Sequence, residues 1–315
     1  GQRMYLLLVS VHGLIRGHEL ELGRDADTGG QTKYVVDLAR ALAKRDDVDQ
    51  VDLVTRRVVD ARVSADYAEP IELLSPKARI VRIDAGPEEY LPKESLWDHL
   101  DSFGDNLVHW LNEQGYMPDL VHSHYADAGY VGVRLSGLLG IALVHTGHSL
   151  GRDKRQRLLA AGLPLEEIDR RYNLNRRVDA EEEVLANADL VITSTHQEIE
   201  DQYGLYDYYR PDRMAVIPPG TDLQQFHPPE SGAPAIPFVK QVSRFLPDAD
   251  KPLILALSRP DPRQNVGTLV DAYGQSPQLQ EIANLLIIAG SRDDIREMDE
   301  GAQSVLTEIL VAIDA

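Results

Sequence analysis

Two adjacent glycines stand where a ligand could approach the backbone closely. Gly29 and Gly30 lie in the segment DADTGGQTKY. The apolar spacing in the following KYVVDLARALAKR predicts a helix with Gln31 in its first turn. The first amides of a helix have no carbonyl partners and lie at the positive end of its dipole, which suits a phosphate or a sugar. A tight turn that needs glycine is the alternative, and the two glycines alone leave both open.

Histidines and other polar residues gather where three predicted strands end. They are His12 and Gly13 after the first strand, His122, His124 and Tyr125 at the fourth, and His145, His148 and Ser149 after the fifth. In open α/β sheets, ligands bind outside the carboxyl ends of the strands. A hydrogen-bonded structural role is the alternative for any one of these histidines. Their gathering at one edge favours a site.

A run of cations follows the fifth strand. We expect Arg155 and Arg157 to lie on a solvated helix face. Lys154 stands near the start of a predicted helix, where a cation opposes the dipole, so a bound phosphate would explain its place. Arg177 precedes the acidic residues 181–183, and either helical ion pairing or a side chain that points inward at the same anion fits it.

The elements that would position these residues alternate along the chain. Short apolar runs predict strands over residues 4–11, 50–58, 78–85, 119–125, 142–148, 189–195 and 214–220. Amphipathic patterns between them predict helices, for example over 94–115 and 170–188. Nearly continuous apolar strands separated by helices are typical of a parallel sheet covered on both faces. We therefore predict a doubly wound α/β domain.

The domain organisation changes after residue 225. We predict an acceptor domain over residues 1–225, a Pro- and Gly-containing linker over 226–250, and a second α/β domain over 251–315. Two strands and two helices cannot bury both faces of a parallel sheet, so we expect this second domain to be incomplete, with roughly 100 residues absent.

Composition and missing motifs exclude several classes of protein. The chain has no Cys, which excludes a thiolate nucleophile and a cysteine-based metal site. Its formal charge of −19 argues against nucleic-acid and anionic-membrane binding. Neither zinc-ligand spacing nor a GxSxG or GxGxxG pattern occurs, so an oxidoreductase is not expected. The first apolar stretch is too short for a bilayer and has no cleavage pattern, which indicates a cytoplasmic protein.

Several strings, in order and across nearly the whole chain, resemble the sucrose-phosphate synthases. They are DADTGGQTKYVVDLARAL, LPKESLW, HSHYADAG, TGHSLGRDK, RRVDAEEEVLANADLVITSTHQEIEDQYGLYD, VIPPGTD, LSRPDPRQNVGTLVDAYG and AGSRDDI. The related sucrose synthases share TGGQ, but HSLGRDK is more similar to the phosphate-using family. The resemblance implies a retaining glycosyltransferase of the GT-B architecture, in which two Rossmann-like domains face each other across the active site.

The resemblance also implies roles for individual residues. UDP-glucose and fructose 6-phosphate would be the substrates, and no tightly bound cofactor or metal is implied beyond stimulation by Mg²⁺. His148 would contact the transferred glucose, and Arg259 would hold the donor diphosphate. The remaining binding residues would be Gly13 near the diphosphate, Gly29, Gly30 and Gln31 at the sugars, and Lys93, Tyr125, Ser149, Lys154 and Arg177 at fructose 6-phosphate.

Two departures from the family pattern matter. Gln264 stands where the family has a Lys that shares the diphosphate. The family's later segment with two Glu separated by seven residues, which holds donor glucose and ribose, would lie beyond Ala315. We therefore expect this chain to bind the acceptor but to turn over poorly by itself. The alternatives to a sucrose-phosphate synthase are a catalytically silent sugar-phosphate-binding module and a sucrose synthase that uses free fructose.

Overall fold

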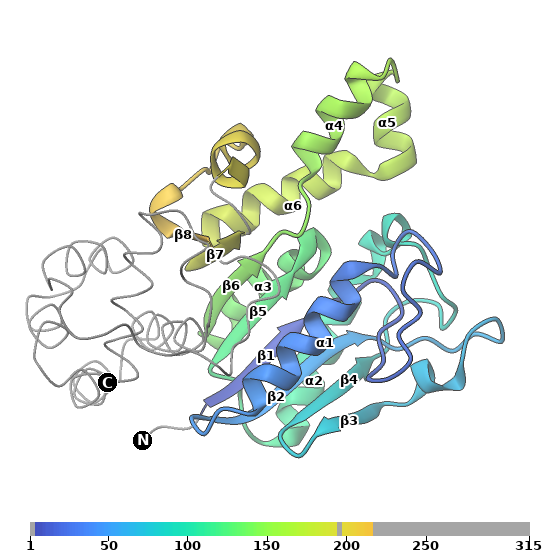
Figure 1. The fold of residues 1–315 in the computed structure, drawn as a ribbon, viewed down its shortest axis with the longest axis vertical. Helices are drawn as coiled ribbons and strands as arrows, with labels where there is room; N and C mark the ends of the chain where they lie inside the picture. The colour runs from blue at the N-terminus through green and yellow to red at the C-terminus, as the bar shows by residue number, and fades with distance from the viewer. Residues whose placement is uncertain (1–3, 194–196, 217–315) are drawn as a thin grey trace, which may run out of the picture.

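The computed structural model describes residues 4–193 and 197–216. It contains one sheet of eight strands with helices on both faces (Figure 1). The strands are β1 (Met4–Val9), β2 (Val48–Arg56), β3 (Ile71–Ser75), β4 (Ala78–Ile83), β5 (Leu120–His124), β6 (Ala142–Thr146), β7 (Leu190–Thr193) and β8 (Met214–Val216). The α-helices are α1 (Gly30–Ala43), α2 (Leu100–Gln114), α3 (Tyr125–Leu139), α4 (Gly151–Ala160), α5 (Leu165–Tyr172) and α6 (Leu174–Asn187).

The strand order is β3-β4-β2-β1-β5-β6-β7-β8. The chain moves outward from β1 to one edge, returns to β5 on the other side of β1, and then moves to the opposite edge. The direction therefore reverses between β1 and β5, which is where doubly wound sheets bind their ligands. This topology confirms the predicted α/β class for the described residues.

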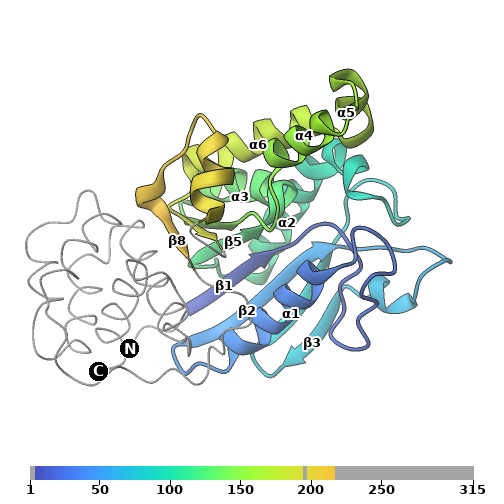
Figure 2. The same ribbon diagram turned by 45° about the horizontal axis from the view of Figure 1, so that its top comes forward.

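Two apolar cores cover the two faces of the sheet. Residues of β1 alternate between them: Leu6 and Leu8 pack with α1, whereas Leu7 and Val9 pack with α2, α3 and α6. All of these side chains are buried, since a central parallel strand has both faces covered. In Figures 1 and 2, α4 and α5 lie side by side and project beyond the end of the sheet.

The sequence prediction needs two corrections. All seven predicted strands are present, but β3 was missed, and it is antiparallel to β4 rather than part of a wholly parallel sheet. Only residues 76 and 77 separate the two strands, and so short a connection can join only antiparallel neighbours. The helix predicted over 170–188 is two helices, because Asn173 adopts a left-handed conformation (φ 50°) that ends α5 and precedes α6.

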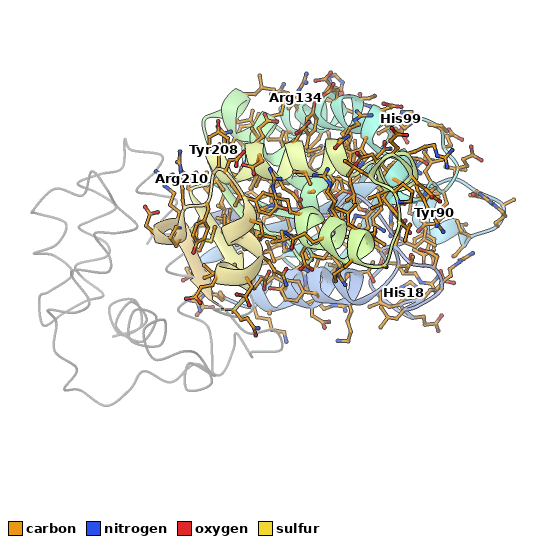
Figure 3. The ribbon with its side chains drawn as sticks, turned by 90° about the horizontal axis from the view of Figure 1, so that it is seen from above. His18, Tyr90, His99, Arg134, Tyr208 and Arg210 are labelled. Carbon is orange, nitrogen blue, oxygen red and sulfur yellow. The ribbon has the colours of Figure 1, made fainter. Side chains whose placement is uncertain are left out.

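Short turns connect the longer elements. One-turn helices cover Ala65–Ala68, Lys93–Ser95, Trp97–His99, Glu198–Gln202, Tyr203–Leu205 and Pro211–Arg213. Tyr90, labelled in Figure 3, lies in the segment before Lys93, and its hydroxyl donates to Asp25 Oδ1 at 2.8 Å. That bond ties the Lys93 segment to the loop before α1. Residues 217–315 fall outside the described part of the chain, so the linker and the second domain stay predictions.

Candidate functional site

A pocket lies beyond the carboxyl ends of the strands and collects residues from four separate segments. It is open to solvent, and its empty space, including the open part, measures about 260 Å³. Its lining residues are Lys93, Glu94 and Trp97 before α2, Tyr125 and Asp127 in α3, Lys154 and Tyr172 in the α4–α5 hairpin, and Arg177 in α6. Four of the five residues expected to hold a sugar phosphate are among them. The fifth, Ser149, is connected to the pocket because its Oγ accepts a hydrogen bond from Arg177 Nη2 at 3.0 Å.

Lys93 is already paired with a buried carboxylate. Its Nζ lies 2.6 Å from Asp27 Oδ1, and its backbone amide donates to Asp27 Oδ2 at 2.7 Å. Burial opposes the charged form, but the hydrogen bond and charge of Asp27 outweigh it and raise the pKa of Lys93. Lys93 is therefore a fixed cation whose charge Asp27 balances.

Lys154 is the cation whose charge is least balanced. Its Nζ lies 4.1 Å from the ring centroid of Tyr172, and within residues 4–193 and 197–216 no carboxylate forms an ion pair with it. Burial, followed by the neighbouring charges of Lys93 and Arg177, lowers the pKa of Lys154. A group of cations that repel one another is stabilised by an anion between them.

Arg177 combines the two roles that the sequence left open. One helical turn after it, Glu181 Oε2 lies 3.4 Å from Arg177 Nε, so the expected ion pairing occurs. The guanidinium carbon also lies 4.5 Å from the ring centroid of Tyr125, and the side chain lines the pocket. Arg157, by contrast, is exposed and pairs with Asp153, as expected for a solvated helix face.

Two residues at this edge adopt strained backbone conformations. Tyr125 (φ 77°) follows β5 and His148 (φ 61°) follows β6. Residues other than glycine seldom adopt positive φ, and such strain gathers at functional sites. Both residues were candidates from the sequence, so the strain supports the same assignment.

His122, His124 and His145 are buried, and His148 lies half-buried beside them. His124 Nδ1 and His148 Nε2 lie 2.9 Å apart, and His122 Nε2 lies 2.8 Å from Thr146 Oγ1. Burial, followed by nearby His12, lowers the pKa of His148 to about 3. Burial also lowers the pKa of His145 to about 3, with His148 adding to the effect. These side chains are uncharged near neutral pH. His122 and His145 therefore fit the alternative of a hydrogen-bonded structural role, since each lies within hydrogen-bond distance of a buried hydroxyl.

The glycines before α1 lie in open space. A Cβ atom built on Gly29 or Gly30 meets nothing within 4 Å, and neither residue has positive φ. A tight turn that only glycine can form therefore does not explain Gly29 and Gly30. Gly29 precedes the helix without a side-chain cap, and Gln31 Nε2 donates to Ser10 Oγ at 2.9 Å. The space at the helix start could receive a ligand.

Gly13 has a conformational reason of its own. Its φ is 83°, and an added Cβ would clash with the backbone of Asp27 and approach Thr32 Cγ2 to 3.2 Å. Glycine is required here whatever ligand lies nearby. The expected contact of Gly13 with a diphosphate stays a prediction, as do the roles of Arg259 and Gln264, which lie outside the described residues.

Sequence reasoning missed several residues of the site. Asp27, Glu94 and Asp127 supply its carboxylates, and Asp127 Oδ2 lies 2.8 Å from His12 Nδ1, within hydrogen-bond distance. Each missed acid lies within three residues of a candidate, as in DADTGG and HYAD. That proximity was the available signal, but the pairing itself joins residues 66 and 115 positions apart.

Over residues 4–193 and 197–216, no three His, Asp or Glu side chains come together as a metal site. No helix in these residues has the length and apolar character to cross a bilayer. The expectation of no tightly bound cofactor stays a prediction.

Comparisons with known proteins bear on this geometry. Sucrose-phosphate synthase 4 of Arabidopsis thaliana is 42% identical over 99% of this chain, and the sucrose-phosphate synthase of Zea mays is 44% identical over 99%. A solved sucrose-phosphate synthase from Thermosynechococcus elongatus is 28% identical with a TM-score of 0.57, and the match covers 87% of this chain and 60% of that one. These findings confirm the resemblance stated from the motifs.

The matches cover nearly all of this chain but only part of each relative. This chain spans 36% and 35% of the lengths of the Arabidopsis and maize relatives, so it corresponds to about a third of each. The model of Glycosyltransferase Family 4 matches residues 28–225, which include α1, the pocket and every described strand after β1. The chain therefore belongs to Glycosyltransferase Family 4.

Proposed function

We propose that this chain forms the acceptor-binding part of a sucrose-phosphate synthase. The reaction moves glucose from UDP-glucose to fructose 6-phosphate with retention of configuration and gives sucrose 6-phosphate and UDP. Its family membership and its named relatives support the glycosyl transfer. The observation that carries the acceptor assignment is the convergence of Lys93, Lys154 and Arg177 on one pocket.

The charge arrangement suits a phosphate better than a neutral sugar. Asp27 pairs with Lys93 and Glu181 pairs with Arg177, whereas Lys154 forms no ion pair in the described residues and is opposed only by the more distant charges of Glu94 and Asp27. Charge-assisted hydrogen bonds from Lys and Arg to phosphate oxygens are about twice as strong as neutral ones. Free fructose would leave Lys154 without an anionic partner, which weighs against a sucrose synthase.

The donor would lie beside the start of α1. Open space at Gly29 and Gly30 leaves room for UDP-glucose near the first helix amides, and the neutral His148 would donate or accept a hydrogen bond at the transferred glucose. The acceptor hydroxyl forms the new bond to the anomeric carbon as the bond to UDP breaks, and the departing phosphate takes the hydroxyl proton. No protein nucleophile is needed, no tightly bound cofactor takes part, and Mg²⁺ would only stimulate.

Isothermal titration of the purified chain tests the acceptor assignment. Lys154→Ala should weaken fructose 6-phosphate binding by about 10- to 150-fold, the worth of one charged hydrogen bond. Arg157→Ala is the matched control, because it removes the same charge from the same helix outside the pocket and should leave binding unchanged. Equal losses for fructose and fructose 6-phosphate would remove the phosphate assignment. UDP release by a protein of the relatives' length separates an enzyme from a silent binding module.

A further inference from the structure

One buried carboxylate beside the pocket holds three segments of the chain together. Glu181 in α6 is 3% exposed. Its two oxygens accept from the Gly151 amide at 3.0 and 3.1 Å, and Oε1 also accepts from Tyr206 Oη at 2.6 Å. Oε2 lies 3.4 Å from Arg177 Nε. Glu181 thus contacts the start of α4, the segment after β7 and the pocket arginine.

The contact with Arg177 restricts the orientation of its guanidinium. Glu181 contacts the Nε side, Ser149 Oγ accepts from Nη2, and the guanidinium lies over the ring of Tyr125. Glu181 lies beside Nε without forming a hydrogen bond to it, and Ser149 accepts from Nη2, so Nη1 stays available to a ligand in the pocket. A guanidinium held in this way has lost most of its rotational freedom before a ligand arrives, which lowers the entropic cost of binding.

The contact with Gly151 restricts the loop that carries His148 and Ser149. Gly151 is the first residue of α4, and its amide is one of the helix amides without a backbone partner. A Cβ on Gly151 would lie 2.7 Å from Glu181 Oε1, so glycine at this position is what allows the carboxylate to approach. Because Glu181 contacts both Gly151 and Arg177, it fixes the spacing between the loop and the arginine.

Burial makes this carboxylate costly for the fold. Desolvation raises the pKa of Glu181 against the opposing charge of Arg177. Replacing a buried ion pair by apolar residues is often neutral or stabilising, so stability alone is a weak reason for one here. Glu181 contacts Arg177 and the first residue of the helix that follows His148 and Ser149, which gives the buried carboxylate a functional reason.

We propose that Glu181 is a positioning residue that fixes Arg177 relative to the loop of His148 and Ser149, so that both meet the phosphorylated acceptor in the correct geometry. The acceptor's identity rests on the proposed function. The positioning of Arg177 rests on the contacts alone.

Two variants separate positioning from charge and from stability. Glu181→Gln keeps the size of the side chain and an oxygen for the Gly151 amide, but it loses the negative charge beside Arg177. Tyr206→Phe is the matched control, since it removes one hydrogen bond to Glu181 and leaves the ion pair intact. Fructose 6-phosphate is titrated into each variant, and melting temperatures are recorded.

Positioning predicts weaker phosphate binding in Glu181→Gln, whereas the gain in positive charge alone would predict tighter binding. Glu181→Gln makes the pocket one charge more positive, yet it should weaken fructose 6-phosphate binding by about 5- to 30-fold, the coupling expected between contacting groups. Tyr206→Phe should lower the melting temperature and keep the affinity within about twofold. Tighter or unchanged binding by Glu181→Gln would overturn the proposal.

A measurement without ligand decides the positioning claim by itself. In the wild-type chain, NMR should show the Nε–H of Arg177, assigned by its loss in Arg177→Lys, exchanging with water at least about tenfold more slowly than that of exposed Arg157. Glu181→Gln should speed this exchange, because Arg177 then loses the neighbouring carboxylate that holds its Nε side in the interior. Rapid exchange in the wild type would overturn the proposal even if Glu181→Gln fails to fold. Absence of fructose 6-phosphate binding with protection intact would instead count against the proposed function.

Discussion

Glycine-to-alanine substitutions at three positions should give three different losses of stability. Gly13 has φ 83° and a blocked Cβ position, Gly115 has φ 86° and open space, and Gly30 has open space without positive φ. Forcing alanine into the left-handed region costs about 1–2 kcal/mol. Overpacking against neighbours that cannot move away adds about 1–3 kcal/mol.

The expected loss of stability at each position is the sum of the backbone cost and the overpacking cost that apply there. Gly13→Ala meets both costs, because the obstacle is the backbone of Asp27, so we expect a loss of about 2–5 kcal/mol. Gly115→Ala, at the end of α2, meets only the first and should lose about 1–2 kcal/mol. Gly30→Ala lies in the first turn of α1 and should be neutral or stabilising by up to about 1 kcal/mol.

Thermal unfolding followed by circular dichroism measures these differences. At about 2–4 °C per kcal/mol, Gly13→Ala should lower the melting temperature by roughly 4–20 °C, and Gly115→Ala by roughly 2–8 °C. Gly13→Ala should also weaken ligand binding, because Asp27 holds Lys93 in the pocket. Equal shifts for Gly13→Ala and Gly115→Ala would refute the argument that the Asp27 backbone blocks this position.

Two further predictions concern the histidines. Burial lowers the pKa of His122 and of His145 to about 3, so between pH 6.5 and about 3 the unfolded chain binds protons that the folded chain does not, and stability falls as pH decreases. Urea unfolding from pH 7.5 to 5.5 should show this loss, at up to about 1.4 kcal/mol per pH unit for each histidine, and a flat profile would contradict it. In a protein of the relatives' length, His148→Ala should reduce turnover far more than fructose 6-phosphate affinity, and near wild-type turnover at saturating substrates would exclude the glucose contact.

Local patterns allowed the sequence to predict the edge of the sheet but not the pairs formed there. Strand ends and cation runs are local features, and they singled out Tyr125, Lys154 and Arg177, which line one pocket in the structure. The pairing of Lys93 with Asp27 depends on how β1 and the segment after β4 come together, which periodicity does not encode. The missed strand β3 has the same explanation, because its partner, not its composition, makes it a strand.

Two residues with an unfavourable backbone conformation lie at the edge of the sheet where we expect the ligand. Both faces of the sheet are covered by cores of buried apolar residues. At its carboxyl edge, Tyr125 and His148 adopt positive φ, and a left-handed residue with a side chain costs about 1–2 kcal/mol.

Neighbouring contacts hold these two residues in place. The ring of Tyr125 packs against Arg177 and lies edge-on to His12, and His148 forms a hydrogen bond with His124. The neighbouring strands β5 and β6 direct both residues to the same edge. Because a stable sheet needs neither the strain nor a group of half-buried cations, both features fit the sugar-phosphate ligand that we propose.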